Sequence, residues 1–176
     1  MKITGGNLRG RALVSPESAK THPMGSRERL ALFNSLQPYL SGAQVLDAYA
    51  GTGALGLEAI SRGAAHATFI EKDHSAAAAL RQNIATLGVE HQTTLVENSV
   101  ENFQSDTKFD LILADPPYDQ ISAAPLSRLA GFLSVAGVLV ISHPADFDAT
   151  AFADVAHLRL LSTKSYAAAR ISLFAR

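Results

Sequence analysis

The sequence predicts an α/β fold built on a mostly parallel sheet. From residue 43 onward, short apolar runs alternate with helix-like segments, which is the pattern of parallel strands joined by crossover helices. The runs are densely apolar, as expected for strands that helices cover on both faces. The last two runs, 157–166 and 169–176, are joined too closely for a helix to fit between them, so we expect them to pair antiparallel.

Each element of this pattern has its own basis in the sequence. Apolar runs predict the strands, and helical spacing with Gly63 and Gly88 as stop residues predicts the helices between them. The expected strands cover 43–50, 66–73, 93–98, 109–117 and 137–144, and the expected helices cover 54–62, 75–87 and 122–134.

An extension precedes this pattern. Glycine and asparagine within residues 5–10 lie between two apolar runs, which predicts a small hairpin that carries arginines. A helix with Ser26 as its N-cap should follow and bury one apolar face. The side chains on that face are Leu30, Phe33, Leu36 and Leu40. We therefore expect a hairpin-and-helix extension over 1–40, packed on a main domain over 41–176.

The composition limits the class of protein. At 176 residues the chain fits one domain. No apolar run approaches the ~18 residues of a membrane-spanning helix, and the first residues lack the apolar core of a secretory signal. The absence of cysteine excludes disulfides, thiolate metal sites and cysteine nucleophiles, and the six histidines show no ligand spacing. We therefore expect a cytoplasmic monomer with no membrane contact and no metal site.

Basic side chains gather at the start of the chain. Residues 1–30 hold six lysines and arginines against two glutamates, a charge of +4, so a chain of formal charge −1 carries −5 over its other residues. This asymmetry indicates either a solvated arm or an end that contacts a polyanion such as nucleic acid. Charge alone leaves both interpretations open.

The stretch "LDAYAGTGALGLEA" (46–59) places an acid before a glycine-rich turn. Gly51, Gly53 and Gly56 follow the spacing that lets backbone N–H groups approach a pyrophosphate in dinucleotide-binding proteins. Asp47 lies close enough to that turn to repel such an anion. S-adenosylmethionine, which carries an ammonium, a sulfonium and no phosphate, suits this acid better, and glycine permits the close backbone approach that its adenosine needs.

Glu71 ends the second expected strand, within the stretch "FIEKD" (69–73). An acid at this position can accept hydrogen bonds from both hydroxyls of a ribose. Because nicotinamide cofactors and methyl donors both carry a ribose, Glu71 does not distinguish between them. A solvated acid at the end of a strand is the plainer alternative.

The stretch "ADPPYD" (114–119) ends the fourth expected strand at the same edge of the sheet, where ligands of open α/β folds bind. Pro116 and Pro117 end strand pairing and leave carbonyl acceptors exposed, Asp115 adds a carboxylate, and Tyr118 adds a flat ring. Such a set suits methylation of an exocyclic amine: acceptors favour the charge that builds on the nitrogen, and the ring stacks on an extruded base. The alternative is that this stretch is only an exposed turn. We favour the catalytic interpretation, because the acid, the glycine-rich turn and Glu71 predict a methyl-donor site in the same domain. Asp115 and water are both open as proton acceptors.

Taken together, these motifs resemble the RsmD-type enzymes of bacteria, which methylate a guanine N2 in 16S ribosomal RNA. The likeness includes "ITGGNLRGRAL" (3–13), "THPMGSRERLALFNSL" (21–36) and the closing "SYAAARISLFAR" (165–176). It implies a Rossmann-like, seven-stranded class I S-adenosylmethionine-dependent methyltransferase fold, S-adenosyl-L-methionine as methyl donor, and ribosomal RNA as partner. By position it implies three groups of residues: Asp47, Ala50, Gly51, Thr52, Gly53, Glu71, Lys72, Asn98, Ser99 and Asp115 for the cofactor, Asp115, Pro116, Pro117 and Tyr118 for catalysis, and Arg9, Arg11, Arg27 and Arg29 for RNA.

Three positions depart from the family pattern. "MGS" (24–26) stands where the family has Thr-Thr-Asp. Ser99 or Asn98 stands where an aspartate contacts adenine, and either side chain can still hydrogen-bond an amino group. Ser142 and His143 stand where the family often has Glu-His, and we assign His143 no catalytic role.

Alternative functions are kept beside the leading one. An N6-adenine methyltransferase acting on RNA or DNA would use the same acceptor groups. A non-catalytic RNA-binding assembly module would keep the fold and the arginines without the chemistry. A nicotinamide-dependent dehydrogenase is the least favoured, because of the acid before the glycine turn.

Overall fold

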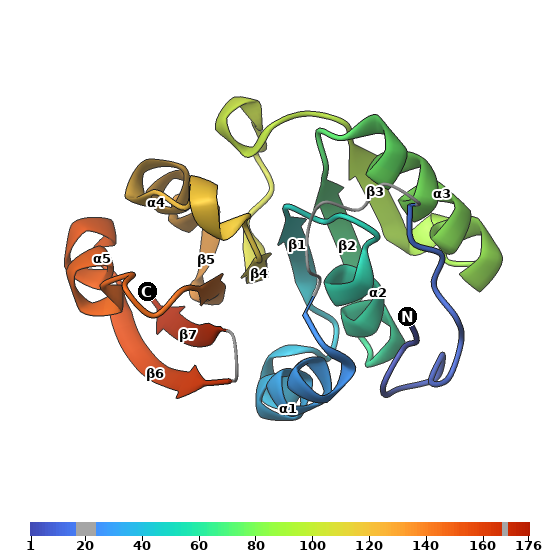
Figure 1. Ribbon diagram of the computed structural model, residues 1–176, viewed down its shortest axis with the longest axis horizontal. Coiled ribbons are helices and arrows are strands. Elements are labelled where there is room, and N and C mark those ends of the chain that lie inside the picture. The colour runs from blue at the N-terminus through green and yellow to red at the C-terminus, as the bar shows by residue number, and fades with distance from the viewer. Residues whose placement is uncertain (17–23, 167–168) are drawn as a thin grey trace.

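The computed structural model describes residues 1–16, 24–166 and 169–176, which fold around one seven-stranded sheet (Figure 1). The strand order is β3-β2-β1-β4-β5-β7-β6. The pairs among β1 to β5 are parallel, and β7 runs antiparallel to both β5 and β6. The strands are β1 Gln44–Ala48, β2 His66–Ile70, β3 Thr93–Val96, β4 Phe109–Ala114, β5 Leu133–His143, β6 Arg159–Ser165 and β7 Arg170–Ala175. The helices are α1 Ser26–Leu36, α2 Ala54–Ser61, α3 His74–Leu87, α4 Ala123–Ala130 and α5 Ala149–Ala156.

The predicted alternation of strands and helices and the antiparallel closing pair are confirmed. Several elements differ from the prediction. Strand β5 begins at Leu133 rather than at 137, and helix α4 therefore ends at Ala130 rather than at 134. Helix α5 was not predicted, although Asp148 caps it by accepting hydrogen bonds from the N–H groups of Thr150 (3.0 Å) and Ala151 (2.9 Å).

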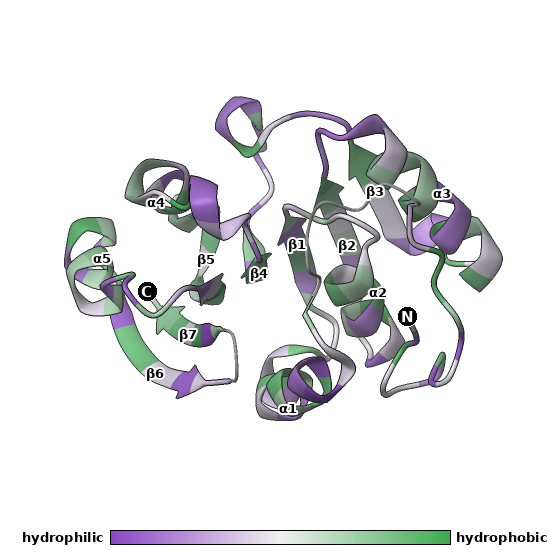
Figure 2. Cartoon of the chain, in the orientation of Figure 1, coloured by the Kyte–Doolittle hydropathy of each residue, from purple (hydrophilic) through white to green (hydrophobic). Residues whose placement is uncertain are grey.

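Helices cover both faces of the sheet. Along β4, Leu111 and Leu113 point into a core shared with α1, α2 and α3, whereas Ile112 and Ala114 point into a second core shared with α4 and α5. The strands therefore carry apolar side chains on both faces, and they are largely coloured as hydrophobic in Figure 2. Among the described residues, no helix is long and apolar enough to cross a membrane.

The N-terminal extension differs in detail from the predicted hairpin. Its two arms form one antiparallel bridge, Lys2 with Ala12, rather than two strands. The N-cap of α1 is Gly25 rather than Ser26. Leu30, expected to be buried, is 41% exposed. The face of α1 that is buried carries Leu32 together with Phe33 and Leu36, and Leu30 lies outside this face. Residues 21–23 of the amino-terminal motif and 167–168 of the closing motif lie outside the described residues.

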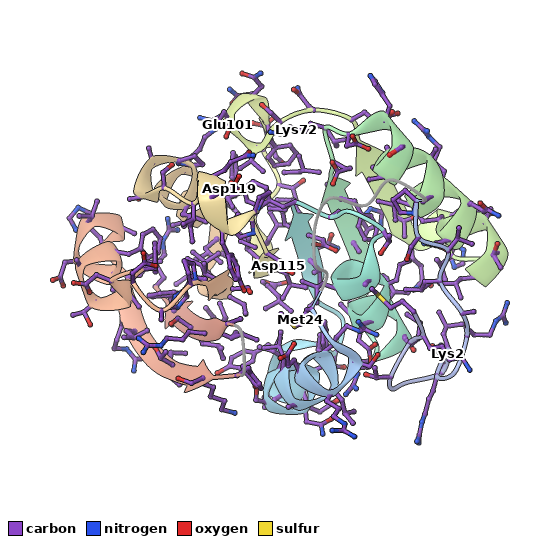
Figure 3. All side chains as sticks on the ribbon, viewed as in Figure 1. Lys2, Met24, Lys72, Glu101, Asp115 and Asp119 are labelled. Atoms are coloured by element: carbon purple, nitrogen blue, oxygen red, sulfur yellow. The ribbon has the colours of Figure 1, made fainter. Side chains whose placement is uncertain are left out.

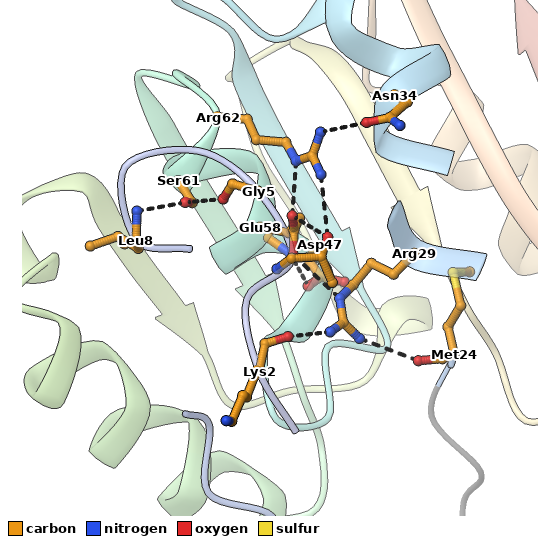
Figure 4. A network of polar contacts seen from close by, with 12 residues as sticks. Lys2, Gly5, Leu8, Met24, Arg29, Asn34, Asp47, Glu58, Ser61 and Arg62 are labelled. Carbon is orange, nitrogen blue, oxygen red and sulfur yellow. Dashed lines mark hydrogen bonds and ion pairs between the residues drawn. The ribbon is translucent and has the colours of Figure 1, made fainter. Parts of the chain in front are cut away.

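A buried polar cluster joins this extension to α2 (Figure 4). The Glu58 carboxylate accepts hydrogen bonds from the N–H (2.8 Å) and hydroxyl (2.7 Å) of Thr4 and from Nε of Arg62 (2.8 Å), and it pairs with Nε of Arg29 at 3.4 Å. Arg29 also donates to the carbonyl groups of Lys2 (2.5 Å) and Met24 (3.3 Å). The prediction that Arg29 contacts RNA is therefore wrong: its side chain is fully buried and neutralises Glu58.

Candidate active site

The two predicted sites meet in one cavity. Strands β1 and β4 are parallel neighbours, with Ala48 paired to Ala114, so the segments that follow them leave the sheet at the same edge. A cavity of about 940 Å³ lies there, and its walls include both the glycine-rich turn and the segment from Asp115 to Tyr118. The predicted residues in its lining are Asp47, Ala50, Gly51, Thr52, Glu71, Lys72, Asn98, Ser99, Asp115, Pro116, Pro117 and Tyr118.

The glycine turn holds Glu71 in place. Oε2 of Glu71 accepts a hydrogen bond from the Gly51 N–H at 2.7 Å, and Oε1 accepts one from the Asp73 N–H at 2.7 Å. Since each carboxylate oxygen has a second lone pair, Glu71 keeps acceptor capacity for a ligand hydroxyl. The backbone thus fixes this carboxylate before any ligand arrives.

Gly53 and Gly56 have packing roles. Gly53 is absent from the described cavity lining, so its predicted direct cofactor contact is not supported. It adopts a φ of 78°, and a Cβ there would collide with Leu80. A Cβ on Gly56 would collide with the ring of Phe69, so this glycine lets α2 approach β2 closely.

Asp47 is a buried acid that forms no ion pair with any of the described residues. It is 1% exposed and accepts a hydrogen bond from the Gly56 N–H at 2.7 Å. Burial raises the pKa of Asp47 well above its usual value, and the negative charges of Asp115 and Glu71 add to this effect. A cationic ligand group in the cavity would stabilise the ionised form of Asp47.

Tyr49 was not predicted as a site residue. It lines the cavity with a φ of 65°, which is unusual for a residue other than glycine. Burial, with a smaller contribution from Glu101, raises the pKa of Tyr49 to about 12, so its hydroxyl stays protonated at neutral pH. Tyr49 lies between two alanines in a run that predicts a strand, and nothing in that run indicates a positive φ at this residue.

Tyr118 hydrogen-bonds Ser142, which lies on β5 beside Asp115. The Tyr118 hydroxyl lies 2.8 Å from Oγ of Ser142. Burial raises the pKa of Asp115, the charge of Glu28 raises it further, and the neighbouring donor groups of Ser142 and Met24 oppose this shift. The sequence identified Ser142 as a departure from the family pattern and gave it no role.

Side chains from distant segments complete the cavity. Glu28 reaches it from α1, Met24 from the segment just before α1, and Tyr166 from the β6–β7 connection. Figure 3 labels five lining residues, which run down the middle of the view near β1 and β4: Met24, Lys72, Glu101, Asp115 and Asp119. Only the approach of these segments in space places their side chains at one site.

The cavity is strongly acidic. Among the described residues, its lining holds seven carboxylates: Glu28, Asp47, Glu71, Asp73, Glu101, Asp115 and Asp119. Two cationic side chains of the same set, Arg29 and Lys72, also line it, and Arg29 is paired with Glu58. This charge favours a cationic ligand over one that carries phosphates. Within the part of the chain that the structure describes, no group of histidine, aspartate and glutamate side chains could hold a metal ion.

The other predicted side chains lie outside the cavity. Arg9, Arg11 and Arg27 are exposed, and Arg11 also donates a hydrogen bond to the Thr86 carbonyl at 2.8 Å. His143 is buried, with Nε2 lying 2.8 Å from Oγ of Ser172, and it does not line the cavity.

Comparison with known proteins identifies the family. The chain matches the family model Conserved hypothetical protein 95 over residues 1–175. Ribosomal RNA small subunit methyltransferase D of Escherichia coli K12 is 42% identical over 119 residues, which make up 67% of this chain and 60% of that protein. This alignment therefore spans about three fifths of the relative's length. Putative rRNA methyltransferase YlbH of Bacillus subtilis is 30% identical over 151 residues, covering 81% of this chain and 82% of that protein.

A solved structure supports the same assignment. Putative methyltransferase yhhF from Escherichia coli superposes with a TM-score of 0.86 at 30% identity, covering 100% of this chain and 97% of that one. The predicted Rossmann-like, seven-stranded class I methyltransferase fold is thereby confirmed. The chain belongs to the Conserved hypothetical protein 95 family, which is the RsmD family that its motifs resemble.

Proposed function

We propose that the protein transfers a methyl group from S-adenosylmethionine to the exocyclic N2 of a guanine in 16S ribosomal RNA. The observation that carries this proposal is the single acidic cavity bounded by both the glycine turn and the Asp115–Tyr118 segment. One cavity can hold a methyl donor and an extruded base together, and transfer requires both in contact. A volume of about 940 Å³ lies at the upper end of the usual range for ligand pockets.

The residues of the cavity fit S-adenosylmethionine, which supplies an electrophilic methyl group when bound. No cationic side chain within residues 1–16, 24–166 and 169–176 pairs with Asp47, and the ligand's ammonium and sulfonium provide positive charge. Glu71, held by Gly51, is placed to accept hydrogen bonds from ribose hydroxyls. Asn98 and Ser99 offer polar groups to adenine. A nicotinamide dinucleotide would instead bring a pyrophosphate into a cavity of carboxylates, so the dehydrogenase alternative is disfavoured.

Acceptor groups near Asp115 favour guanine as the methylated base. The Watson–Crick edge of guanine presents the N2 amine beside an N1–H donor, whereas adenine presents its N6 amine beside an acceptor nitrogen. Asp115 and the Pro116 carbonyl suit the amine, and the carboxylate of Glu28 adds an acceptor for a neighbouring N–H. Two adjacent donors therefore match this wall of the cavity better than a donor beside an acceptor.

Asp115 also serves as the proton acceptor in this proposal. Methylation of the amine would release one proton, which the Asp115 carboxylate would accept, while the bound donor would supply the electrophilic methyl group. Burial raises the pKa of Asp115, which makes its carboxylate a better base than an exposed one. Tyr118, 36% exposed at the cavity rim, offers its ring for stacking on the base.

The substrate is held by the basic N-terminal extension. Arg9, Arg11 and Arg27 are exposed and place positive charge outside the acidic cavity, where they contact phosphates without reading sequence. In this proposal residues 1–40 bind RNA and 41–176 carry the chemistry. The protein acts as a cytoplasmic monomer on 16S RNA, either free or in an assembling small subunit.

Nucleoside mass spectrometry tests the reaction. Incubation with S-adenosylmethionine and small-subunit RNA should yield N2-methylguanosine, and Asp115→Ala should abolish it while RNA affinity changes little. Methylated adenosine without methylated guanosine would overturn the choice of base. If the wild type methylates no RNA, the alternative of a non-catalytic assembly module replaces the enzyme. Calorimetry should show tighter binding of S-adenosylhomocysteine than of NAD.

A further inference from the structure

Asn83 on α3 is hydrogen-bonded to both the N-terminal extension and the glycine-rich turn. Its Oδ1 accepts from the Val14 N–H at 2.7 Å, and its Nδ2 donates to the carbonyl groups of Val14 (3.0 Å) and Thr52 (3.0 Å). The side chain is 1% exposed. These contacts reach segments that lie 69 and 31 residues from Asn83 in the sequence, at a place where the extension passes along α3 (Figure 1).

The three contacts use both N–H groups and the oxygen of the Asn83 amide. A primary amide has two N–H donors and one carbonyl acceptor, and here each of these groups has a partner. Turning the amide over would place its oxygen against the carbonyl oxygens of Val14 and Thr52, which would lose both of these bonds. The orientation of the amide is therefore determined by its partners, and neither aspartate nor alanine can make the same set of bonds.

Both partners of Asn83 belong to walls of the cavity. Thr52 is a lining residue, and Ser15 and Pro16, which follow Val14 directly, are lining residues as well. Asn83 is not among the described residues that line the cavity, so it acts on the cavity through the backbone of these two segments. One buried amide thus fixes the glycine turn and the end of the extension together.

We propose that Asn83 is a positioning residue for the methyl donor, whose amide holds the glycine turn and the end of the extension in the arrangement that binds S-adenosylmethionine. Without this amide, the carbonyl groups of Thr52 and Val14 lose their donor, and each segment can leave that arrangement before the donor arrives. Donor binding must then restore the arrangement, which lowers the affinity by the fraction of molecules that keep it. This inference rests on the proposed function, which places the donor in this cavity.

Ser61 on α2 provides a matched control. It is also a buried polar residue on a helix, 3% exposed, and its hydroxyl accepts from the Leu8 N–H (2.9 Å) and donates to the Gly5 carbonyl (2.6 Å). Both contacts hold the extension to α2, and neither involves the glycine turn. Ser61→Ala therefore loosens the extension alone, whereas Asn83→Ala loosens the extension and the turn.

Methyl-transfer kinetics and calorimetry compare these variants. Asn83→Ala should raise the KM for S-adenosylmethionine and the Kd for S-adenosylhomocysteine about tenfold, because a partly buried carbonyl group loses its donor, while kcat at saturating donor and RNA changes less than about threefold. Ser61→Ala should leave the KM and the Kd within about twofold of the wild type. Equal rises in Asn83→Ala and Ser61→Ala, or a fall in kcat alone, would overturn the inference.

A second substitution covers the case in which Asn83→Ala does not fold. Asn83→Asp keeps the volume of the side chain and the acceptor for the Val14 N–H, and it removes the amide donor to the Thr52 carbonyl. It should weaken binding of S-adenosylhomocysteine at least as much as Asn83→Ala, because a carboxylate oxygen then faces the carbonyl oxygen. An affinity equal to that of the wild type would contradict the role of this bond.

Amide exchange gives a readout that does not depend on catalysis or on a ligand. The Gly53 N–H donates to the Ala50 carbonyl at 2.8 Å, a bond within the glycine turn that neither substitution removes. Asn83→Ala should accelerate exchange of the Gly53 amide, and Ser61→Ala should not. Unchanged exchange in Asn83→Ala would refute the inference. If the wild type binds no S-adenosylhomocysteine, the proposed function fails, and exchange at Gly53 still decides whether Asn83 holds the turn.

Discussion

Replacing Glu58 by glutamine removes one negative charge from a fully buried cluster and keeps the shape of the side chain. In the wild type, Oε2 of Glu58 accepts from the Thr4 N–H (2.8 Å) and Arg29 Nε (3.4 Å), while Oε1 accepts from the Thr4 hydroxyl (2.7 Å) and Arg62 Nε (2.8 Å). The best placement of the glutamine keeps its oxygen toward the Thr4 N–H and Arg29. Its amide group then donates to the Thr4 hydroxyl and faces Arg62 without an acceptor.

This geometry sets the size of the effect. The Arg29 side chain is completely buried and would lose its only compensating carboxylate among the described contacts. Breaking a buried ion pair by removing one partner costs about 3–5 kcal/mol. Because Arg62 is 7% exposed and can turn toward water, we expect the lower end, about 3 kcal/mol. For a domain of this size that loss lowers Tm by roughly 6–12 °C.

Urea denaturation followed by circular dichroism measures this loss, and amide exchange locates it. Exchange of the Thr4 amide should accelerate more than that of the strand amides, because the extension detaches from α2 first. Glu90→Gln is the control, since Glu90 is exposed, and it should change stability by less than about 0.5 kcal/mol. A loss of stability no larger for Glu58→Gln than for Glu90→Gln would refute the reasoning.

Three other changes have defined outcomes. Asp47→Asn should raise Tm, because burial opposes the charged carboxylate, yet weaken S-adenosylmethionine binding about tenfold to a hundredfold by calorimetry; unchanged affinity would exclude an interaction with the donor's positive charge. Burial lowers the pKa of His143, so the unfolded chain binds the proton more readily and stability should fall as pH drops below about 6.5; if the stability of His143→Gln falls equally with pH, other titrating groups cause the loss. Arg9→Ala and Arg11→Ala should each flatten the salt dependence of RNA binding by about one unit of slope. Arg159→Ala, a change at an exposed position on β6, should leave that slope unaltered. Equal slopes in all variants would show that the extension does not contact RNA.

The sequence determined the order of the strands, the helices other than α5, and the two loops that meet at the site. These features depend on local rules: apolar runs favour buried strands, a glycine is needed where φ is 78° at Gly53, and prolines end pairing after β4. Once the strands are parallel, their carboxyl ends must share an edge. The cavity between Asp47, Glu71 and Asp115 could therefore be predicted without coordinates.

Only the tertiary structure decided which polar side chains meet. Thr4 and Glu58 are 54 residues apart, and Tyr118 and Ser142 are 24 apart, so no local pattern relates the members of either pair. Arginine is a residue type that often contacts RNA, but Arg29 instead pairs with the buried Glu58. A side chain's partner depends on how separate segments pack, and hydrogen bonds act over about 3 Å, a distance that sequence separation does not encode.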